Sequence, residues 1–376
     1  MTFASTSRTT VRICLLLAST ATGACVAPTA EHLDDTEQKV AGDLEGWAYF
    51  DGTTLPAYRS YNSTGATNSV FRVFAGRYNV TFPGLGAAGI EGNVQVTAAG
   101  GGNERCTIND WFESGGDIDV DVGCHTPSGD WSDSPFVVSF VKFPGGTAHS
   151  ADGAYLRTDP GGASLSSGFQ WGAPISETHV ATGQYQITLG GASTVGGTVV
   201  VTTYGWTRAY CKPANWVVDG ADTKINVRCF DPGGTPADTG FSLRYIRHTR
   251  DSRFGSGGFV WANQPTALDY TPSTTYQENR LASECGNHFF TNTAHRVAKG
   301  RYQITYPSQM VDVPPSGAAL VTAYGSGSEY CKLTNWEAPS SIPGAVRIGT
   351  RCFDASGFLV DSRFTEVFFS QAFLVC

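Results

Sequence analysis

The feature that most constrains the fold is a cysteine followed five positions later by a tryptophan, which occurs three times. The copies read "CTINDW" from Cys106, "CKPANW" from Cys211 and "CKLTNW" from Cys331. Copies spaced by roughly a hundred residues indicate tandem domains, since solenoid units recur every 20 to 50 or so. The chain of 376 residues therefore carries one structural unit three times.

Each unit reads as a series of β-strands. An aromatic strand opens it ("GWAYF", "GAYLR", "GFVWA"), a Gly-x-Tyr strand follows ("GRYNVTF", "GQYQITL", "GRYQITY"), and a third segment comes next ("NVQVTAAG", "VVVTTYG", "ALVTAYG"). The alternation in these segments is typical of half-buried strands. Abundant Gly (45), Phe (22) and Tyr (15), with only 2 Met, also favour an all-β protein.

We therefore predict three tandem antiparallel β-sandwich-like domains, each with one internal disulfide. Their predicted ranges are 45–149, 150–254 and 255–376, and the last range ends in an extra copy of the opening strand, "QAFLVC". A six-bladed β-propeller with two sheets per repeat is the alternative, because four strands in about fifty residues also fit a blade.

A second cysteine follows the first in every copy, which predicts disulfides between neighbouring strands. Zinc sites need ligands at short spacing, and no His or Cys lies two to four residues from these cysteines. The last two cysteines, peculiar to the third domain, would join the final strand to its body. The predicted pairs are Cys106 with Cys124, Cys211 with Cys229, Cys331 with Cys352, and Cys285 with Cys376.

The repeated tryptophans leave two alternatives open. Five residues is an odd separation, so in an unbroken strand each indole points away from the face of its cysteine and becomes a candidate for stacking on a ligand such as a sugar ring. A β-bulge just before the tryptophan returns it to the core, which we favour. The tryptophans are Trp111, Trp216 and Trp336, and the bulges would lie at Asp110, Asn215 and Asn335.

An aspartate follows the second cysteine at a constant distance in all three copies: Asp133, Asp238 and Asp361. Each stands just before an aromatic strand and beyond a turn sequence ("TPSG", "DPGG", "DASG"). We expect these carboxylates to accept backbone N–H groups at a turn, which is commoner than ligation of an ion.

Residues 1–24 have the layout of a secretory signal, with Arg8 and Arg12 ahead of a short apolar run and then small residues. The run is too short to span a membrane. Its end, "TGAC", resembles the lipobox of bacterial lipoproteins, in which the cysteine, here Cys25, carries the lipid. Thr22 departs from that pattern, so plain secretory cleavage is the alternative.

Cysteine counting favours the lipid anchor. Removal of Cys14 with the signal and lipidation of Cys25 leave eight of the 10 cysteines, an even number suited to an oxidising compartment. The polar, acidic residues 25–44 then form a flexible tether. We predict an exported protein, lipid-anchored at the cell envelope or secreted, whose sole membrane contact is that anchor.

Charge and motifs exclude several functions. With 25 basic and 33 acidic residues, the chain has no basic surplus for nucleic acid. No nucleophile elbow, zinc-protease helix or phosphate-binding loop is present, so no catalytic residue, metal ligand or cofactor is predicted.

The segments "FVWANQPTALDYTPSTTY", "GRYQITY", "VTAYG", "CKLTNW", "RCFDASG" and "DSRF" together resemble a tandem β-repeat of secreted actinobacterial and myxobacterial proteins. The resemblance covers residues 45–376 and is best in the third copy. It implies export and repeated β-domains, and it implies no activity, ligand or catalytic residue.

Repetition without a unique polar cluster favours a non-catalytic surface protein that binds glycans or envelope proteins through several weak sites. Two alternatives remain. One is a secreted hydrolase of the glycosidase type, with its site in the third copy, where the insertion "ENRLASECGNHFFTNTAH" adds a charged loop. The other is a structural spacer without a small ligand.

Overall fold

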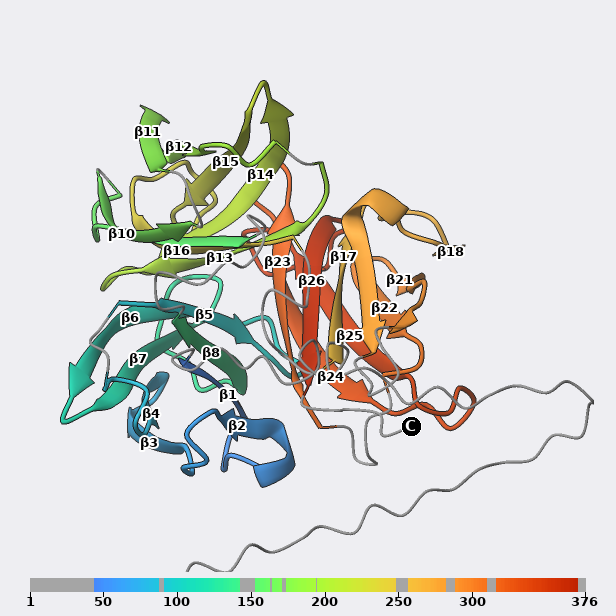
Figure 1. Ribbon diagram of the computed structural model, residues 1–376, viewed down its shortest axis with the longest axis horizontal. Helices are drawn as coiled ribbons and strands as arrows, with labels where there is room; N and C mark the ends of the chain where they lie inside the picture. The colour runs from blue at the N-terminus through green and yellow to red at the C-terminus, as the bar shows by residue number, and fades with distance from the viewer. Residues whose placement is uncertain are drawn as a thin grey trace, which may run out of the picture. The chain divides into compact units, whose positions relative to one another are not determined.

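The computed structural model is an all-β molecule (Figure 1) that describes residues 44–87, 91–142, 153–162, 164–170, 174–193, 195–247, 256–281, 288–309 and 316–370. Strands β1–β8, β9–β16 and β17–β26 belong to repeats 1, 2 and 3. All three repeats lie in one compact unit, Lys39–Cys376.

Repeat 1 is a sandwich of two antiparallel sheets. The first sheet has the order β2-β1-β8-β5, with β1 at Leu44–Phe50, β2 at Ser60–Asn62, β5 at Asn93–Ala98 and β8 at Phe136–Lys142. The second has the order β3-β4-β7-β6, with β3 at Ser69–Phe74, β4 at Arg77–Phe82, β6 at Arg105–Ser114 and β7 at Asp117–His125. A 3-10 turn, η2 (Ala57–Arg59), precedes β2.

Repeat 2 has the same strand order. Its first sheet is β10-β9-β16-β13, with β9 at Gly153–Thr158, β10 at Leu165–Gln170, β13 at Thr198–Tyr204 and β16 at Gly240–Ile246. A single parallel pairing of β13 with β6 joins this sheet to the second sheet of repeat 1, so the two form one eight-stranded sheet. Its second sheet is β11-β12-β15-β14, with β11 at Ile175–Ala181, β12 at Gln184–Leu189, β14 at Tyr210–Asp219 and β15 at Asp222–Phe230.

Repeat 3 adds one short strand to each sheet. The first sheet is β20-β19-β17-β26-β23, with β17 at Ser256–Ala262, β19 at Gln277–Leu281, β20 at His288–Phe289, β23 at Ala318–Tyr324 and β26 at Arg363–Ser370. The second is β18-β21-β22-β25-β24, with β18 at Asp269–Tyr270, β21 at Thr293–Ala298, β22 at Arg301–Tyr306, β24 at Tyr330–Glu337 and β25 at Val346–Phe353. Another 3-10 turn, η4 (Thr274–Tyr276), precedes β19.

This topology confirms the predicted sandwiches. Within repeat 1 the first, eighth and fifth strands lie side by side, so consecutive strands do not form one meandering sheet. A propeller blade is a four-stranded sheet that needs consecutive strands as neighbours, and the order β2-β1-β8-β5 does not provide them, so the propeller alternative is wrong. The final strand predicted in "QAFLVC" lies outside the described residues.

The alternation of the sequence sets the two faces of each second sheet. In β4, Tyr78, Val80 and Phe82 are buried, whereas Arg77, Asn79 and Thr81 point outward. Side chains at every second position share a face, so the inward set packs against the first sheet and the outward set faces away from the core. The residues of β12 and β22 alternate in the same way.

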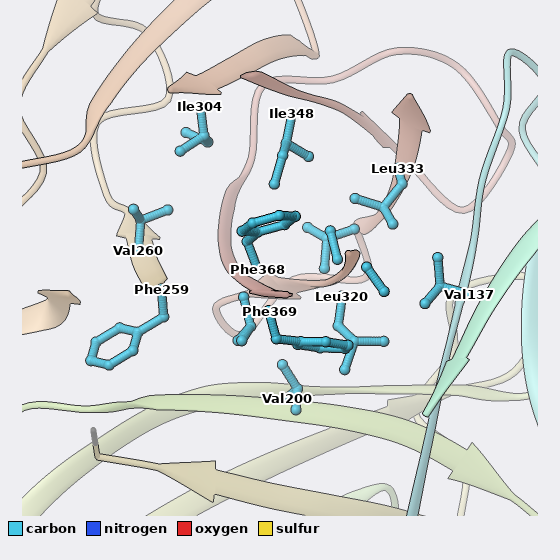
Figure 2. Close-up of a cluster of buried hydrophobic side chains, with 14 of the residues drawn as sticks. Val137, Val200, Phe259, Val260, Ile304, Leu320, Leu333, Ile348, Phe368 and Phe369 are labelled. Atoms are coloured by element: carbon cyan, nitrogen blue, oxygen red, sulfur yellow. The ribbon is translucent and has the colours of Figure 1, made fainter. Parts of the chain in front are cut away.

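The hydrophobic core of repeat 3 extends beyond its own strands. Figure 2 shows Ile304, Ile348 and Phe368 stacked inside the sandwich, with Val137 of β8 and Val200 of β13 close by. Residues from all three repeats therefore share one cluster of buried side chains. Burial across the repeats is what makes the three sandwiches a single compact unit.

Candidate functional site

The three repeated cysteine pairs form disulfides, as predicted. Each bridge joins directly opposed residues of the last two strands in the order of a second sheet: β7 and β6, β15 and β14, and β25 and β24. The bridges are Cys106–Cys124, Cys211–Cys229 and Cys331–Cys352. The predicted pair Cys285 with Cys376, the lipidation residue Cys25 and the signal segment lie outside the described residues.

The repeated tryptophans are buried, which confirms the alternative that we favoured and makes the alternative of stacking on a ligand wrong. Trp111, Trp216 and Trp336 are only 1, 6 and 2% exposed. A β-bulge between the cysteine and the tryptophan reverses the odd spacing and turns the indole inward. The shift of register lies between Ile108 and Asp110 in β6, and the bulge therefore falls one residue earlier than we predicted.

Each buried tryptophan instead packs against the next repeat. Trp111 meets Tyr204 of repeat 2 with ring centroids 5.1 Å apart, and Trp216 meets Tyr324 of repeat 3 at 5.4 Å. Trp336 returns to repeat 1, where its ring lies 4.9 Å from that of Tyr49. The three contacts run from repeat 1 to 2, from 2 to 3 and from 3 to 1, which closes a ring.

Hydrogen bonds of backbone and hydroxyl groups join the repeats in the same cyclic order. The Val96 amide donates to the Thr202 hydroxyl, which in turn donates to the Val96 carbonyl. Equivalent two-way contacts join Thr322 to Val201 and Thr97 to Val321. A backbone amide also crosses each boundary, in Gly205 to Ile108, Gly325 to Pro213 and Gly100 to Thr334. We call these, with the tryptophan contacts, the inter-repeat contacts.

The same lysine–glutamate ion pair crosses two of the three boundaries. Buried Lys212 donates to Glu329 at 3.0 Å, and buried Lys332 donates to Glu104 at 2.9 Å. Burial lowers the pKa of both lysines, and the glutamates partly oppose that effect. At the third boundary the corresponding positions hold Thr107 and Ala209, so both charges of the pair are absent together.

The ion pairs line a central cavity of about 60 Å³ between the repeats. Arg105 closes part of its wall, with its guanidinium 4.3 and 4.7 Å from the rings of Tyr210 and Tyr330. Its volume is that of a few water molecules at most. The cavity is thus a feature of the packing between repeats and is well below the usual size of a small-molecule site.

The repeated aspartates are turn anchors, as we expected. Asp133 accepts the Gly76 amide at 2.8 Å and the Tyr78 hydroxyl at 2.6 Å, and it pairs with Arg72. The hydrogen bond from Arg72 is the main reason that the pKa of Asp133 lies well below its ordinary value. Asp238 and Asp361 accept the equivalent glycine and tyrosine groups.

The most distinctive surface is the outward face of the second sheet of repeat 1. Strand β3 places Phe71 and Phe74 on it, because they lie opposite Asn79 and Arg77 of β4. Phe71 is 68% exposed, and Trp206, from the turn after β13, is 62% exposed. We call the set the aromatic face: Phe71, Phe74, Phe112, Trp131 and Trp206.

Polar side chains lie between these rings in fixed positions. Arg77 lies 4.6 Å from the centroid of Trp206 and donates to Asp121 at 2.6 Å. Asp121 also accepts from Asn109 at 2.7 Å, so both of its neighbours are oriented by one buried carboxylate. Two residues before it on β7, Asp119 accepts from Thr81 and from Asn79. The face therefore combines exposed rings with preset donors and acceptors.

The aromatic face exists in repeat 1 only. Cross-strand pairing identifies the equivalent positions, because Phe71 faces Asn79 as Thr178 faces Gln186 and His295 faces Gln303. Neither of the other repeats has a Phe, Tyr or Trp at any of the five positions. Repeat 2 has Thr178, Ala181, Val217, Pro236 and Ser326, and repeat 3 has His295, Ala298, Glu337, Leu359 and Gly101.

Sequence reasoning missed this face because it looked for features shared by the copies. The detectable signal was the reverse, a set of aromatic residues confined to the copy that fits the repeat pattern least well. Finding it also required the strand pairing, since Trp206 belongs to repeat 2 in sequence and to the face of repeat 1 in space.

The insertion of repeat 3, where a hydrolase site was expected, lies partly outside the described residues. Within its described part, His295 contacts Asp269 at 2.7 Å, with both side chains exposed. The described ranges contain no group of three His, Cys, Asp or Glu side chains that could hold a metal ion. No helix in those ranges is long and apolar enough to cross a membrane.

Comparisons of the chain with protein-family models, with curated proteins and with solved structures found no match.

Proposed function

We propose that the protein binds a carbohydrate chain on the aromatic face of repeat 1. The observation that carries the proposal is the confinement of five aromatic side chains to one outward face, around a preset polar network. Sugar rings present apolar C–H faces that pack on aromatic rings and hydroxyl edges that need donors and acceptors. The aromatic face offers both kinds of group within one surface.

The dimensions suit an extended ligand. Phe71 on β3 and Phe112 on β6 are separated by three strand spacings, or about 14 Å, which is wide enough for more than one sugar ring. The Arg77 charge is balanced by Asp121, and Asp119 adds one negative charge close to this pair. A neutral or weakly charged glycan therefore fits better than a strongly anionic polymer.

A protein partner is the main competitor, because large exposed aromatic surfaces also mark protein interfaces. The polar network favours the glycan. Such networks in protein interfaces usually surround an apolar centre, whereas here Arg77, Asn79 and Asp119 lie in the middle and the rings lie around them.

The proposal includes export and anchoring through Cys25. Three disulfides indicate an oxidising environment, and a surface that binds glycans acts outside the cytosol. The tether of residues 25–44 would hold the three repeats at a distance from the membrane to which the lipid is attached.

A glycan array followed by calorimetry tests the proposal. Phe71→Thr and Trp206→Ser introduce the residues of repeat 2, and each should raise Kd at least about tenfold, because the loss of a ring that anchors the ligand should cost about 1.4 kcal/mol or more. Phe358→Ala is the matched control, because Phe358 is equally exposed on another repeat. Silence of the wild-type protein on the array, or unchanged binding by both variants, would overturn the proposal.

A further inference from the structure

The outward face of repeat 2 contains a hollow of about 420 Å³ at the position where repeat 1 carries Trp206. Strands β12, β14 and β15 form its floor, and the turn after β23 forms one side. The turn holds Ser326, whose small side chain replaces the indole of Trp206 and leaves the space open. A volume of this size lies within the usual range of small-molecule sites.

The charge of the hollow is opposite to that of the aromatic face. Gln184 and Asn226 stand where repeat 1 has Arg77 and Asp121, so the central ion pair is replaced by two amides. Arg228 and Arg363 are added at its edges. Neither arginine forms an ion pair with a carboxylate of the described residues. The hollow thus contains two guanidinium groups whose charge is not balanced locally.

Hydrogen bonds orient the side-chain amides of Asn226 and Asn215. Gln186 donates to the Asn226 side-chain oxygen at 3.3 Å, and the Asn226 amide donates to the Asn215 side-chain oxygen at 2.6 Å. This chain of hydrogen bonds leaves the Asn215 NH₂ group as a donor at the hollow. Tyr324 supplies a ring on the side of the turn.

We propose that this hollow, the arginine hollow, binds an anionic sugar residue. The acid group, a carboxylate or a sulfate ester, lies against Arg228 and Arg363, because guanidinium groups bind planar and tetrahedral oxyanions through paired N–H donors. The sugar hydroxyls meet the amides of Gln184 and Asn215, and the sugar ring packs on Tyr324. The inference rests on the proposed glycan-binding function and adds to it a second site of different charge.

The aromatic face and the arginine hollow occupy equivalent positions on successive repeats. A chain with neutral and acidic residues could contact both, which would raise its apparent affinity beyond that of either site alone. Each site can nevertheless be tested separately, because the two share no side chain.

Calorimetry with three oligosaccharides of equal length tests the inference: one with uronic acids, one with sulfate esters and one that is neutral. The full exported chain should bind at least one acidic oligosaccharide at least about tenfold more tightly than the neutral one at low salt, and the difference should shrink as salt rises. Comparison of the carboxylated and sulfated ligands identifies the acid group.

Two variants and one control complete the experiment. Arg228→Gln with Arg363→Gln should remove the preference for acid, and Ser326→Trp should do the same by filling the hollow. Arg301→Gln, on the exposed face of repeat 3, should leave that preference intact. Equal binding of acidic and neutral ligands by the wild type, or a preference that survives both variants, would overturn the inference. Loss of neutral binding in Trp206→Ser with the acid preference retained would confirm that the two sites act independently.

Discussion

The inter-repeat contacts and the outward faces of the second sheets differ in how they use repetition. Trp111, Trp216 and Trp336 recur in every copy and are buried between repeats. Trp206 occurs once and is mostly exposed, and the equivalent residue of the next repeat is Ser326. In this molecule, residues that recur maintain the architecture, whereas residues that diverge on the surface give each repeat its own chemistry.

The largest expected effect is the difference in stability between the variants Trp336→Ala and Trp206→Ala. The first removes a buried ring that packs on Tyr49 and lies 4.1 Å from the Arg59 guanidinium, so it should lower the free energy of unfolding by about 3–5 kcal/mol. The second should change it by less than about 0.5 kcal/mol. Urea unfolding measures both, and equal destabilisation by the two variants would contradict the contrast.

Glu366 is a core residue at a position where the repeats differ from one another. It is fully buried between the sheets of repeat 3, where the other repeats have Val138 and Leu243. Burial raises its pKa to about 8 from an ordinary 4.5, and Thr350 donates to the carboxyl group. The folded protein therefore holds this proton more tightly than the unfolded chain does.

Stability from the protonated Glu366 is full below pH 4.5 and declines as pH rises toward 8. The loss should be on the order of 4 kcal/mol over that window. Glu366→Leu should remove the decline and raise stability at neutral pH, as followed by urea unfolding at several pH values. Parallel pH profiles for the two proteins would show that Glu366 is ionised in the folded state.

His125 gives a smaller effect of opposite sign. It is buried, with Phe230 and Phe353 at the equivalent positions, and neither ring nitrogen has a hydrogen-bond partner. Burial, with Arg208 and Arg105 nearby, lowers its pKa to about 4. Its contribution is therefore present above pH 6.5 and is lost as pH falls toward 4.

The substitution His125→Phe should stabilise the protein by about 1 kcal/mol at pH 7, because it removes two unpaired polar atoms from a buried site. It should stabilise the protein further at pH 5. Thermal unfolding at the two pH values provides the measurement. A variant less stable than wild type at pH 5 would contradict the assignment of a neutral, buried imidazole.

The smallest effect on stability should come from exchanging the two surface residues, Trp206→Ser with Ser326→Trp. Both positions lie on turns, so the free energy of unfolding should stay within about 0.5 kcal/mol of wild type. Binding should change instead: the neutral glycan should bind about tenfold more weakly to the aromatic face. Unchanged glycan affinity would show that Trp206 has no part in binding.

The sequence was sufficient to predict the sandwiches and the disulfides, because alternation and cysteine spacing depend on local rules that all three copies obey. The sequence pattern left both burial and exposure of the tryptophans open, because a one-residue bulge reverses the face that a side chain occupies. In repeat 1 this bulge lies between Ile108 and Asp110. The amino-acid pattern by itself does not reveal where such a bulge lies.

The candidate site could not be predicted for a different reason. Its residues come from β3, β4, β6, β7 and a turn of the following repeat, and their proximity depends on strand order and on packing between repeats. Aromatic residues in each segment, such as Phe71 and Phe112, are individually unremarkable in a β-rich chain. Only the pairing of strands places them together on one face.

The closed cycle of inter-repeat contacts also limits how such a protein can change in length. An open solenoid can gain or lose a repeat, because each unit contacts only its neighbours and the ends are free. Here repeat 3 contacts repeat 1 through Trp336 and Tyr49, so a fourth unit would have to break an existing contact, and a two-unit chain would expose buried indoles to water. Evolution of this chain is thus free to alter the three outward faces separately while the number of copies stays fixed at three.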